Sequence, residues 1–218
     1  MDNNFGKKGI IYFDLGDTLI YRERPSVEFD IEAIETVTGI QKKYLEEFDE
    51  SLENLYFPVL EANKCASLKD EEIKVRNVFE SILANFGQKE KLKQVLDIRS
   101  KQKRYKLFTD VEKYLKKSKN MYHLGIITNG RPSRRIILQQ LGIDKYFEPN
   151  LIFISDEIGI SKPDDKIKDI VRKKEFGDKI ILVDDEIDNI KMAQSFGWRG
   201  IQLKRAGGIG LELLDQFI

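Results

Sequence analysis

Short apolar runs occur near both ends of the chain, separated by segments in which apolar residues recur at helical spacing. Four runs rich in isoleucine lack the polar–apolar alternation of a half-exposed strand: "GIIYF" (9–13), "LGIIT" (124–128), "LIFIS" (151–155) and "KIILV" (179–183). Continuous runs of this length are typical of strands buried on both faces of a parallel sheet. A fifth strand is expected over "GIQL" (200–203).

The segments that follow the later runs predict helices. Apolar residues recur at helical spacing over residues 137–141, 167–171 and 187–196, and "IGLELLDQF" (209–217) predicts a closing helix. Strands and helices that alternate in this way favour an α/β fold, a doubly wound parallel sheet with right-handed crossovers. We therefore expect a Rossmann-like core in which helices cover both faces of the sheet.

Residues 22–104 have a different pattern, without any strand-like run. Apolar residues recur at helical spacing over 44–59, and more cleanly over 75–86. This pattern predicts an all-helical domain inserted after the first strand, within the usual size range of a small domain. The core domain would then consist of residues 1–21 and 105–218.

Composition and charge exclude several classes of partner. Lys and Arg together number 37, as do Asp and Glu, so the formal net charge is zero, and no overall field favours nucleic acid or an anionic membrane surface. No run approaches the about 20 apolar residues that a membrane-spanning helix needs. The single cysteine, Cys65, cannot form an internal disulfide, which is typical of a reducing compartment. The sequence therefore predicts a cytoplasmic protein without nucleic-acid or membrane partners.

Reactive polar side chains stand where the predicted strands end. They are Asp14, Thr128, Asn129, Asp184 and Asp185, with Lys162 in the loop after the third strand. The carboxyl ends of parallel strands share one edge of the sheet, so we expect these side chains to line one crevice. Carboxylates placed together repel one another unless a cation neutralises them. Oxygen ligands select a hard ion, and Mg²⁺ is the expected cofactor.

Four motifs in this order, "DLGDT" (14–18), "TNG" (128–130), "SKPD" (161–164) and "VDDEIDN" (183–189), resemble the signature motifs of the haloacid dehalogenase (HAD) superfamily. Each motif alone is an ordinary turn or helix cap, but four of them at four strand ends indicate one site. The resemblance covers nearly the whole chain. It implies a HAD core with a helical cap, and a Mg²⁺-dependent phosphohydrolase that acts on a small phosphorylated metabolite.

The resemblance also implies roles for the residues that would meet the substrate. Asp14 would be the nucleophile that attacks phosphorus and forms an aspartyl-phosphate, which water then hydrolyses. Thr128 would donate a hydrogen bond to the phosphoryl group, and Asn129 and Gly130 would shape its turn. Lys162 would offset the negative charge on the phosphoryl group and on Asp14.

The same resemblance implies a Mg²⁺ site formed by the carboxylates of Asp14 and Asp185 and the backbone carbonyl of Gly16, aided by Asp184. At Gly16 the chain departs from the common family pattern, which has there a second acid that protonates the leaving oxygen. A glycine keeps the carbonyl ligand and loses the acid. The next acid, Asp17, is one residue further, and adjacent side chains of an extended segment point to opposite faces.

Three sources of the missing proton stay open. Asp17 could act as the acid after a local backbone change that Gly16 permits. A residue at the start of the cap could replace it; the candidates are Tyr21, Arg22, Glu23 and Arg24. Finally, the leaving group could be weakly basic, as in a sugar 1-phosphate or an acyl phosphate. The third interpretation is narrowly favoured, because general acid catalysis matters least for a leaving group of low pKa.

Two other functional classes also stay open. The first is a catalytically weak HAD-like module that binds phosphate and serves regulation; Gly16 favours it and the other intact motif residues oppose it. The second comprises dehalogenases and phosphonatases, which likewise lack an acid at that position. A phosphonatase would need a cap lysine, for which the candidates are Lys42, Lys43 and Lys64. Mg²⁺ dependence separates a phosphatase from a dehalogenase, while the substrate and the oligomeric state are left open by the sequence.

Overall fold

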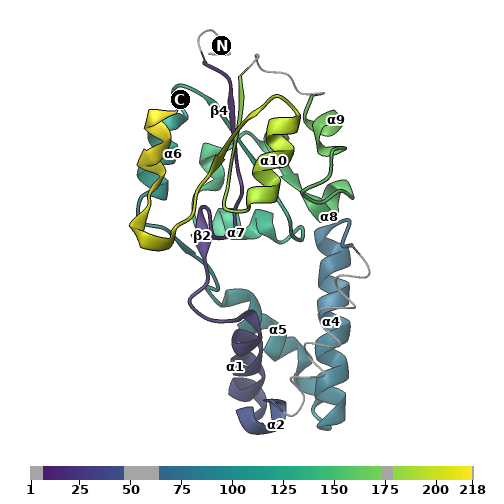
Figure 1. Ribbon diagram of the computed structural model, residues 1–218. Coiled ribbons are helices and arrows are strands. Elements are labelled where there is room, and N and C mark those ends of the chain that lie inside the picture. The colour runs from purple at the N-terminus through teal and green to yellow at the C-terminus, as the bar shows by residue number, and fades with distance from the viewer. Residues whose placement is uncertain (1–6, 47–63, 173–178, 218) are drawn as a thin grey trace. The chain divides into compact units, whose positions relative to one another are not determined.

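The computed structural model describes residues 7–46, 64–172 and 179–217 (Figure 1). By its internal contacts the chain divides into two compact units, Met1–Tyr21 with Leu107–Ile218, and Arg22–Lys106. The sequence analysis placed the boundaries after residues 21 and 104. Each unit contains a hydrophobic core of its own, as is usual for a domain.

The first unit is built on a five-stranded sheet in the order β5-β4-β1-β6-β7, and its strand pairs are parallel. The strands are β1 (Ile10–Phe13), β4 (His123–Thr128), β5 (Ile152–Ile154), β6 (Ile180–Asp184) and β7 (Arg199–Gln202). Each strand lies within one residue of a predicted apolar run. The parallel α/β core expected from these runs is confirmed.

A pairing of one large and one small residue fixes the register between β1 and β4. Tyr12 is fully buried and lies opposite Gly125. A Cβ atom on Gly125 would come within 2.5 Å of the Tyr12 ring, so only glycine leaves room for this tyrosine. The ring also packs against Phe153 and Trp198, with centroids 6.0 and 6.2 Å away. This register sets the strand ends that carry Asp14 and Thr128 side by side.

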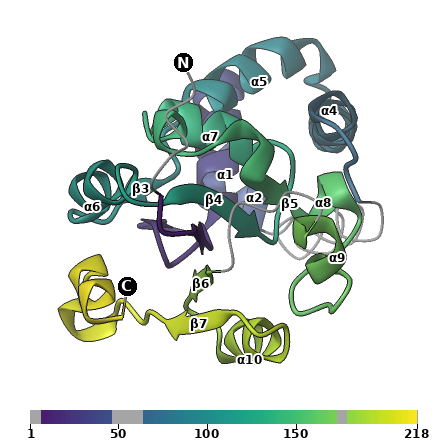
Figure 2. The ribbon, with the colours of Figure 1, turned by 90° about the horizontal axis from the view of Figure 1, so that it is seen from above.

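Helices cover both faces of the sheet. They are α6 (Val111–Ser118), α7 (Arg134–Gln140), α8 (Ser155–Ile158), α9 (Ile167–Arg172) and α10 (Ile187–Ser195). Figure 2 shows α9 and α10 on one side of the sheet, and α6 with the C-terminal 3₁₀ helix η5 (Leu211–Gln216) on the other. None of the described helices has the length and apolar character that crossing a bilayer requires.

The remaining 3₁₀ helices of this unit are η2 (Asp144–Tyr146), η3 (Pro149–Leu151) and η4 (Ala206–Gly208). The closing helix predicted over residues 209–217 is shorter than expected, because η5 begins only at Leu211, after an extended Gly210. The Asp110 carboxylate accepts a hydrogen bond from the Leu211 N–H, which fixes this start. A second sheet pairs β2 (Ile20–Tyr21) with β3 (Lys106–Leu107), where the chain passes between the two units.

In the described part of the second unit, residues 22–46 and 64–106, the regular elements are helices, and its last residue, Lys106, begins β3. Its elements are α1 (Ser26–Thr38), α2 (Lys42–Glu46), α4 (Leu68–Asn85), η1 (Lys89–Lys91) and α5 (Leu92–Lys101). Buried apolar residues of α1, α4 and α5, among them Ile34, Phe79 and Val95, form its core. The helical pattern over 75–86 falls in α4. The pattern over 44–59 begins in α2 and continues from residue 47 outside the described residues.

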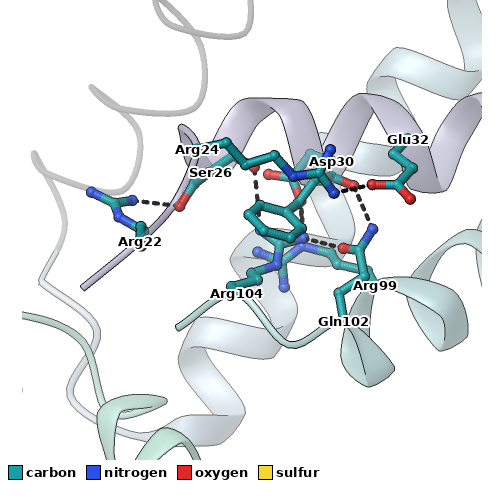
Figure 3. A network of polar contacts seen from close by, with 9 residues as sticks. Arg22, Arg24, Ser26, Asp30, Glu32, Arg99, Gln102 and Arg104 are labelled. Carbon is teal, nitrogen blue, oxygen red and sulfur yellow. Dashed lines mark hydrogen bonds and ion pairs between the residues drawn. The ribbon is translucent and has the colours of Figure 1, made fainter. Parts of the chain in front are cut away.

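A buried polar network ties the two ends of this unit together (Figure 3). The Asp30 carboxylate on α1 is 3% exposed and forms ion pairs with Arg99 and Arg104. Gln102 donates a hydrogen bond to the Phe29 carbonyl at 2.7 Å. The guanidinium carbon of Arg24 lies 4.0 Å from the centroid of the Phe29 ring. Residues at the start and end of the insert are therefore held by one another within the unit.

Three of the four residues considered above as alternative proton donors, Arg22, Glu23 and Arg24, take part in local contacts of the second unit. Arg22 donates a hydrogen bond to the Ser26 hydroxyl, and Arg24 pairs with Glu32 (Figure 3). Glu23 pairs with Lys106 at 2.6 Å. All three pairs lie within the second unit.

Candidate active site

The predicted site residues lie in the first unit, at the carboxyl ends of its strands. From β1 the chain runs outward to β4 and β5, then returns to β6 on the other side of β1. The strand order therefore reverses between β1 and β6, and ligands of such sheets bind in the crevice outside this point. The N–H of Asp14 donates to the carbonyl of Val183 in β6 at 2.8 Å, which joins the two strand ends at the crevice.

Lys162 occupies the centre of the site. Its ammonium lies 2.7 Å from Asp14 Oδ1 and also pairs with Asp184 Oδ2, and its side chain is 2% exposed. Burial by itself lowers the pKa of Lys162, but the two adjacent carboxylates outweigh it and raise that pKa above the ordinary value. Burial raises the pKa of the Asp14 carboxyl, and Lys162 opposes this shift. The lysine is thus a fixed positive charge between two acids.

Asp184 uses both of its carboxylate oxygens on donors from the protein. Oδ1 accepts hydrogen bonds from the Glu186 N–H at 2.9 Å and from Asn189 Nδ2 at 3.0 Å, while Oδ2 pairs with Lys162. Asn189 lies in the first turns of α10 and is buried. The sequence analysis included Asn189 in the motif "VDDEIDN" but gave it no role. Its position near the start of a helix that follows a strand end could have indicated one.

Asp185 has a different environment, because within the described residues its side chain forms no ion pair with a lysine or an arginine. Burial, followed by the charges of Asp14 and Asp184, raises the pKa of Asp185 to about 6. The backbone carbonyl of Asp185 accepts a hydrogen bond from Gln202 Nε2 at 2.9 Å. The Lys162 ammonium pairs with Asp14 and Asp184 but not with Asp185, so three acids stand beside one cation, and this excess of negative charge suits a divalent cation.

The described residues contain no group of three or more His, Cys, Asp or Glu side chains arranged to enclose a metal ion. Mg²⁺ does not require such a group, because the ion keeps several waters and takes one or two carboxylates together with phosphate oxygens. The donor set at this edge, two neighbouring carboxylates of Asp14 and Asp185 with backbone carbonyls, therefore fits Mg²⁺. It does not provide a closed cage of protein ligands.

The turn after β4 is connected to two other segments of the site. Thr128, 3% exposed, ends the strand. The Asn129 side chain forms two hydrogen bonds with the backbone of Lys162. The Gly130 N–H donates to the Ser155 hydroxyl at 3.0 Å. A Cβ atom on Gly130 would lie 2.7 Å from the Arg134 side chain, so glycine lets this turn pack closely. The three predicted residues are thus brought to the same edge as Lys162.

Asp17, not Gly16, has the unusual backbone in the first motif. Asp17 has a φ of 51°, in the left-handed region, which Asp tolerates better than most residues. Its N–H donates to the Ile20 carbonyl at 2.8 Å, and its side chain is exposed. A Cβ atom built on Gly16 would meet no heavy atom within 4 Å. The position of the missing acid is therefore open space.

An open hollow of about 440 Å³ lies beside this motif. Its lining residues are Asp17, Phe108, Asp185, Glu186, Ile187, Gln202, Lys204, Arg205 and Ala206. Asp17 and Asp185 thus border the same space, within the first unit. The hollow is large enough for a small organic group.

Arg205 is a supporting residue whose place the sequence did not settle. Its guanidinium donates to the Thr18 carbonyl at 2.8 and 2.6 Å and pairs with Asp110 at 2.8 Å. It therefore holds the loop that carries Asp14 and Asp17. Asp110 was missed, because 95 residues separate it from Arg205 and no local pattern connects the two.

A family model described as haloacid dehalogenase-like hydrolase matches residues 9–197. This match spans the first strand, the insert and the crevice residues. A search of curated proteins finds no match.

Solved structures with the same fold include both phosphatases and dehalogenases. A HAD family enzyme from Bacteroides thetaiotaomicron, in complex with magnesium and inorganic phosphate, is 20% identical, with a TM-score of 0.61 over 95% of this chain and 99% of that one. A HAD phosphatase from Thermococcus onnurineus is 19% identical, with a TM-score of 0.59 over 94% and 89%. A 2-haloacid dehalogenase from Pseudomonas syringae is 21% identical, with a TM-score of 0.58 over 93% and 88%.

Proposed function

Because this chain belongs to the haloacid dehalogenase-like hydrolases, we propose that it is a Mg²⁺-dependent phosphohydrolase whose nucleophile is Asp14. The observation that carries this proposal is the uncompensated charge at Asp185, whose pKa burial and the carboxylates of Asp14 and Asp184 raise to about 6. A dehalogenase has no phosphoryl group to bind and no need of a metal, so this excess of negative charge would only disfavour it. A cation bound there serves a phosphatase directly.

In the proposed reaction a carboxylate oxygen of Asp14 attacks phosphorus, and the bond to the leaving oxygen breaks. Water then attacks the aspartyl-phosphate, which releases phosphate and restores the carboxylate. The ammonium of Lys162, 2.7 Å from Asp14 Oδ1, offsets the charge that the transition state spreads over the equatorial oxygens. Thr128, at the end of the neighbouring strand, would donate a hydrogen bond to one of these oxygens.

We assign the Mg²⁺ ligands to the carboxylates of Asp14 and Asp185 and the carbonyl of Gly16. When bound, the ion would neutralise charge on the phosphoryl group and on these acids. Asp184 has both oxygens occupied by protein donors, so it would act as the counter-charge that holds Lys162. The choice of Mg²⁺ is supported by the similar HAD family enzyme from Bacteroides thetaiotaomicron, which was solved in complex with magnesium and inorganic phosphate.

The proposal extends to the substrate and its surroundings. The substrate would be a small phosphorylated metabolite in the cytoplasm, and the helical unit Arg22–Lys106 would serve as the cap. The hollow beside Asp17 is a place for its leaving group. Closure of such a cap excludes water from the reacting phosphoryl group.

The test measures nitrophenol released from p-nitrophenyl phosphate, with Mg²⁺ and with a chelator, and halide released from 2-haloacids under the same conditions. We expect turnover of the phosphate ester that is lost with the chelator and restored by added Mg²⁺, and no halide. Halide release that is insensitive to the chelator would instead make the protein a dehalogenase. Binding of phosphate without any turnover would favour the regulatory module, the candidate that the missing acid at Gly16 keeps open.

Gly16→Asp is expected to give the enzyme the acid that its first motif lacks. The site has room for the new side chain, because nothing lies within 4 Å of the added Cβ and the backbone of Gly16 is outside the left-handed region. We expect hydrolysis of an alkyl phosphate, whose leaving group is strongly basic, to rise about 10²-fold, since general acids typically contribute that much. Hydrolysis of p-nitrophenyl phosphate should change little.

The matched control is Gly16→Asn, which has the same shape and no proton to donate at neutral pH. Rates are compared over a series of phosphate esters whose leaving groups span a wide range of pKa. The wild type should show a steep fall with rising pKa, and Gly16→Asp a flatter one. Equal gains for the Asn and Asp variants, or a flat dependence in the wild type, would show that no proton is missing at this position.

A further inference from the structure

The Asn129 side chain binds the backbone of Lys162 through both of its polar atoms. Nδ2 donates to the Lys162 carbonyl oxygen at 2.8 Å, and Oδ1 accepts from the Lys162 N–H at 2.8 Å. The pairing requires a donor and an acceptor at once, so it also fixes the orientation of the amide. It resembles the exchange of two hydrogen bonds between neighbouring strands, and it joins segments that are 33 residues apart in the chain.

This contact matters because a lysine side chain has many conformations. Its flexible stem loses rotamer entropy when it is held in one conformation, and its ammonium acts only if it lies at one place. In this structure the Lys162 backbone is held by Asn129, and the ammonium at the other end is held by Asp14 and Asp184. A shift of the backbone would move the anchor of the side chain away from these two carboxylates.

We propose that Asn129 is a positioning residue for Lys162 and does not itself contact the substrate. The sequence analysis placed Asn129 with the substrate-binding turn. In the structure its donor and acceptor atoms are directed to the Lys162 loop, while its neighbour Gly130 binds Ser155. The three residues of the turn thus have different roles. Thr128 would bind the phosphoryl group, Asn129 binds the backbone of Lys162, and Gly130 binds the first residue of α8. This inference rests on the proposed function in so far as Lys162 acts on a phosphoryl group.

The test is a double-mutant cycle made of the wild type, Asn129→Ala, Lys162→Ala and the double variant. Activity with p-nitrophenyl phosphate and Mg²⁺ is separated into kcat and KM. We expect Asn129→Ala to lower kcat by about 10²-fold, as small misplacements of catalytic groups do. In the Lys162→Ala background the same change should cost little, because the group that Asn129 positions is already gone.

Ser155→Ala is the matched control, because it removes a hydrogen bond of the same turn without touching the Lys162 segment. Its effect, whatever its size, should be equal in the presence and absence of Lys162. Asn129→Asp supplies a second variant of nearly the same shape that keeps the acceptor and loses the donor to the Lys162 carbonyl. It replaces Asn129→Ala in the kinetic cycle if thermal unfolding shows that the smaller side chain impairs folding.

Hydrogen exchange at the Lys162 amide supplies a measurement that needs no turnover. We expect Asn129→Ala to speed this exchange, since the N–H loses its acceptor, and Ser155→Ala to leave it unchanged. An equal kinetic cost of Asn129→Ala in both backgrounds, or an unchanged exchange rate, would overturn the proposal. Absence of turnover in the wild type would count against the proposed function alone, because the exchange experiment still decides whether Asn129 holds Lys162.

Discussion

Replacing Asp14 with Asn is expected to lower phosphatase turnover at least about 10⁴-fold, a loss of the size seen when the nucleophile of a covalent mechanism is removed. The amide has the same shape as the carboxylate but cannot attack phosphorus. Folding should be preserved, because burial raises the pKa of Asp14 and thus disfavours its charged form, and a neutral amide avoids that cost. Lys162 keeps its second partner, Asp184.

The measurement is the rate of nitrophenol release with saturating Mg²⁺, together with thermal unfolding of the same samples. The control is Asp188→Asn, the same chemical change in the "VDDEIDN" motif at a side chain that is 70% exposed and pairs with Lys191 on the surface. This control should retain the wild-type rate. Turnover of the Asp14→Asn variant close to that of the control would remove Asp14 from the mechanism.

Lys162→Met is expected to reduce both activity and stability. The methionine has a similar length and no charge, so the transferring phosphoryl group loses a fixed cation, for which a cost of about 10³-fold in kcat is typical. Asp14 and Asp184 are at the same time left buried without their partner. Removing one member of a buried ion pair typically costs about 3–5 kcal/mol of unfolding free energy.

The loss of stability in this variant should depend on pH in a defined direction. Burial already raises the pKa of Asp14 while Lys162 opposes the shift, so without the lysine the folded-state pKa rises further above the unfolded one. The folded state then binds more protons than the unfolded state, and stability increases as the pH falls through that raised pKa. The deficit relative to the wild type should therefore be largest at neutral pH and shrink toward the ordinary pKa of aspartate.

Urea unfolding at several pH values measures this dependence. Lys191→Met is the control, since the Lys191 side chain is 68% exposed and pairs with Asp188 on the surface of α10, where an ion pair contributes at most about 1 kcal/mol. A deficit in Lys162→Met that is equally small, or that does not change with pH, would mean that Lys162 does not neutralise the buried acids.

The strands and the proximity of Asp14 and Lys162 could be predicted from the sequence. The strands follow from the local pattern of apolar residues, and the proximity follows from the geometry of a parallel sheet. Continuous Ile-rich runs mark buried parallel strands, and the carboxyl ends of such strands share an edge.

Which of the two neighbouring acids, Asp184 or Asp185, pairs with Lys162 could not be predicted. Adjacent side chains at a strand end point in opposite directions, but the sequence does not tell which direction leads to Lys162. The left-handed backbone of Asp17 was equally hidden, because the neighbouring Gly16 is the residue that propensity would place there. Contacts such as that of Arg205 with Asp110 depend on side-chain directions that only the folded chain defines.

The network around Asp30 has a consequence for how this architecture can change over generations. Arg99 and Arg104 pair with one carboxylate that lies 69 and 74 positions earlier in the chain. The two ends of the inserted unit are therefore joined by contacts within the unit, and we expect that the unit can be exchanged as a whole. Helices between these anchor points can be lengthened, shortened or replaced while β1 and β4 keep their register. The inserted unit can then change in evolution while the sheet stays the same, and the same site residues can occur with many different inserts.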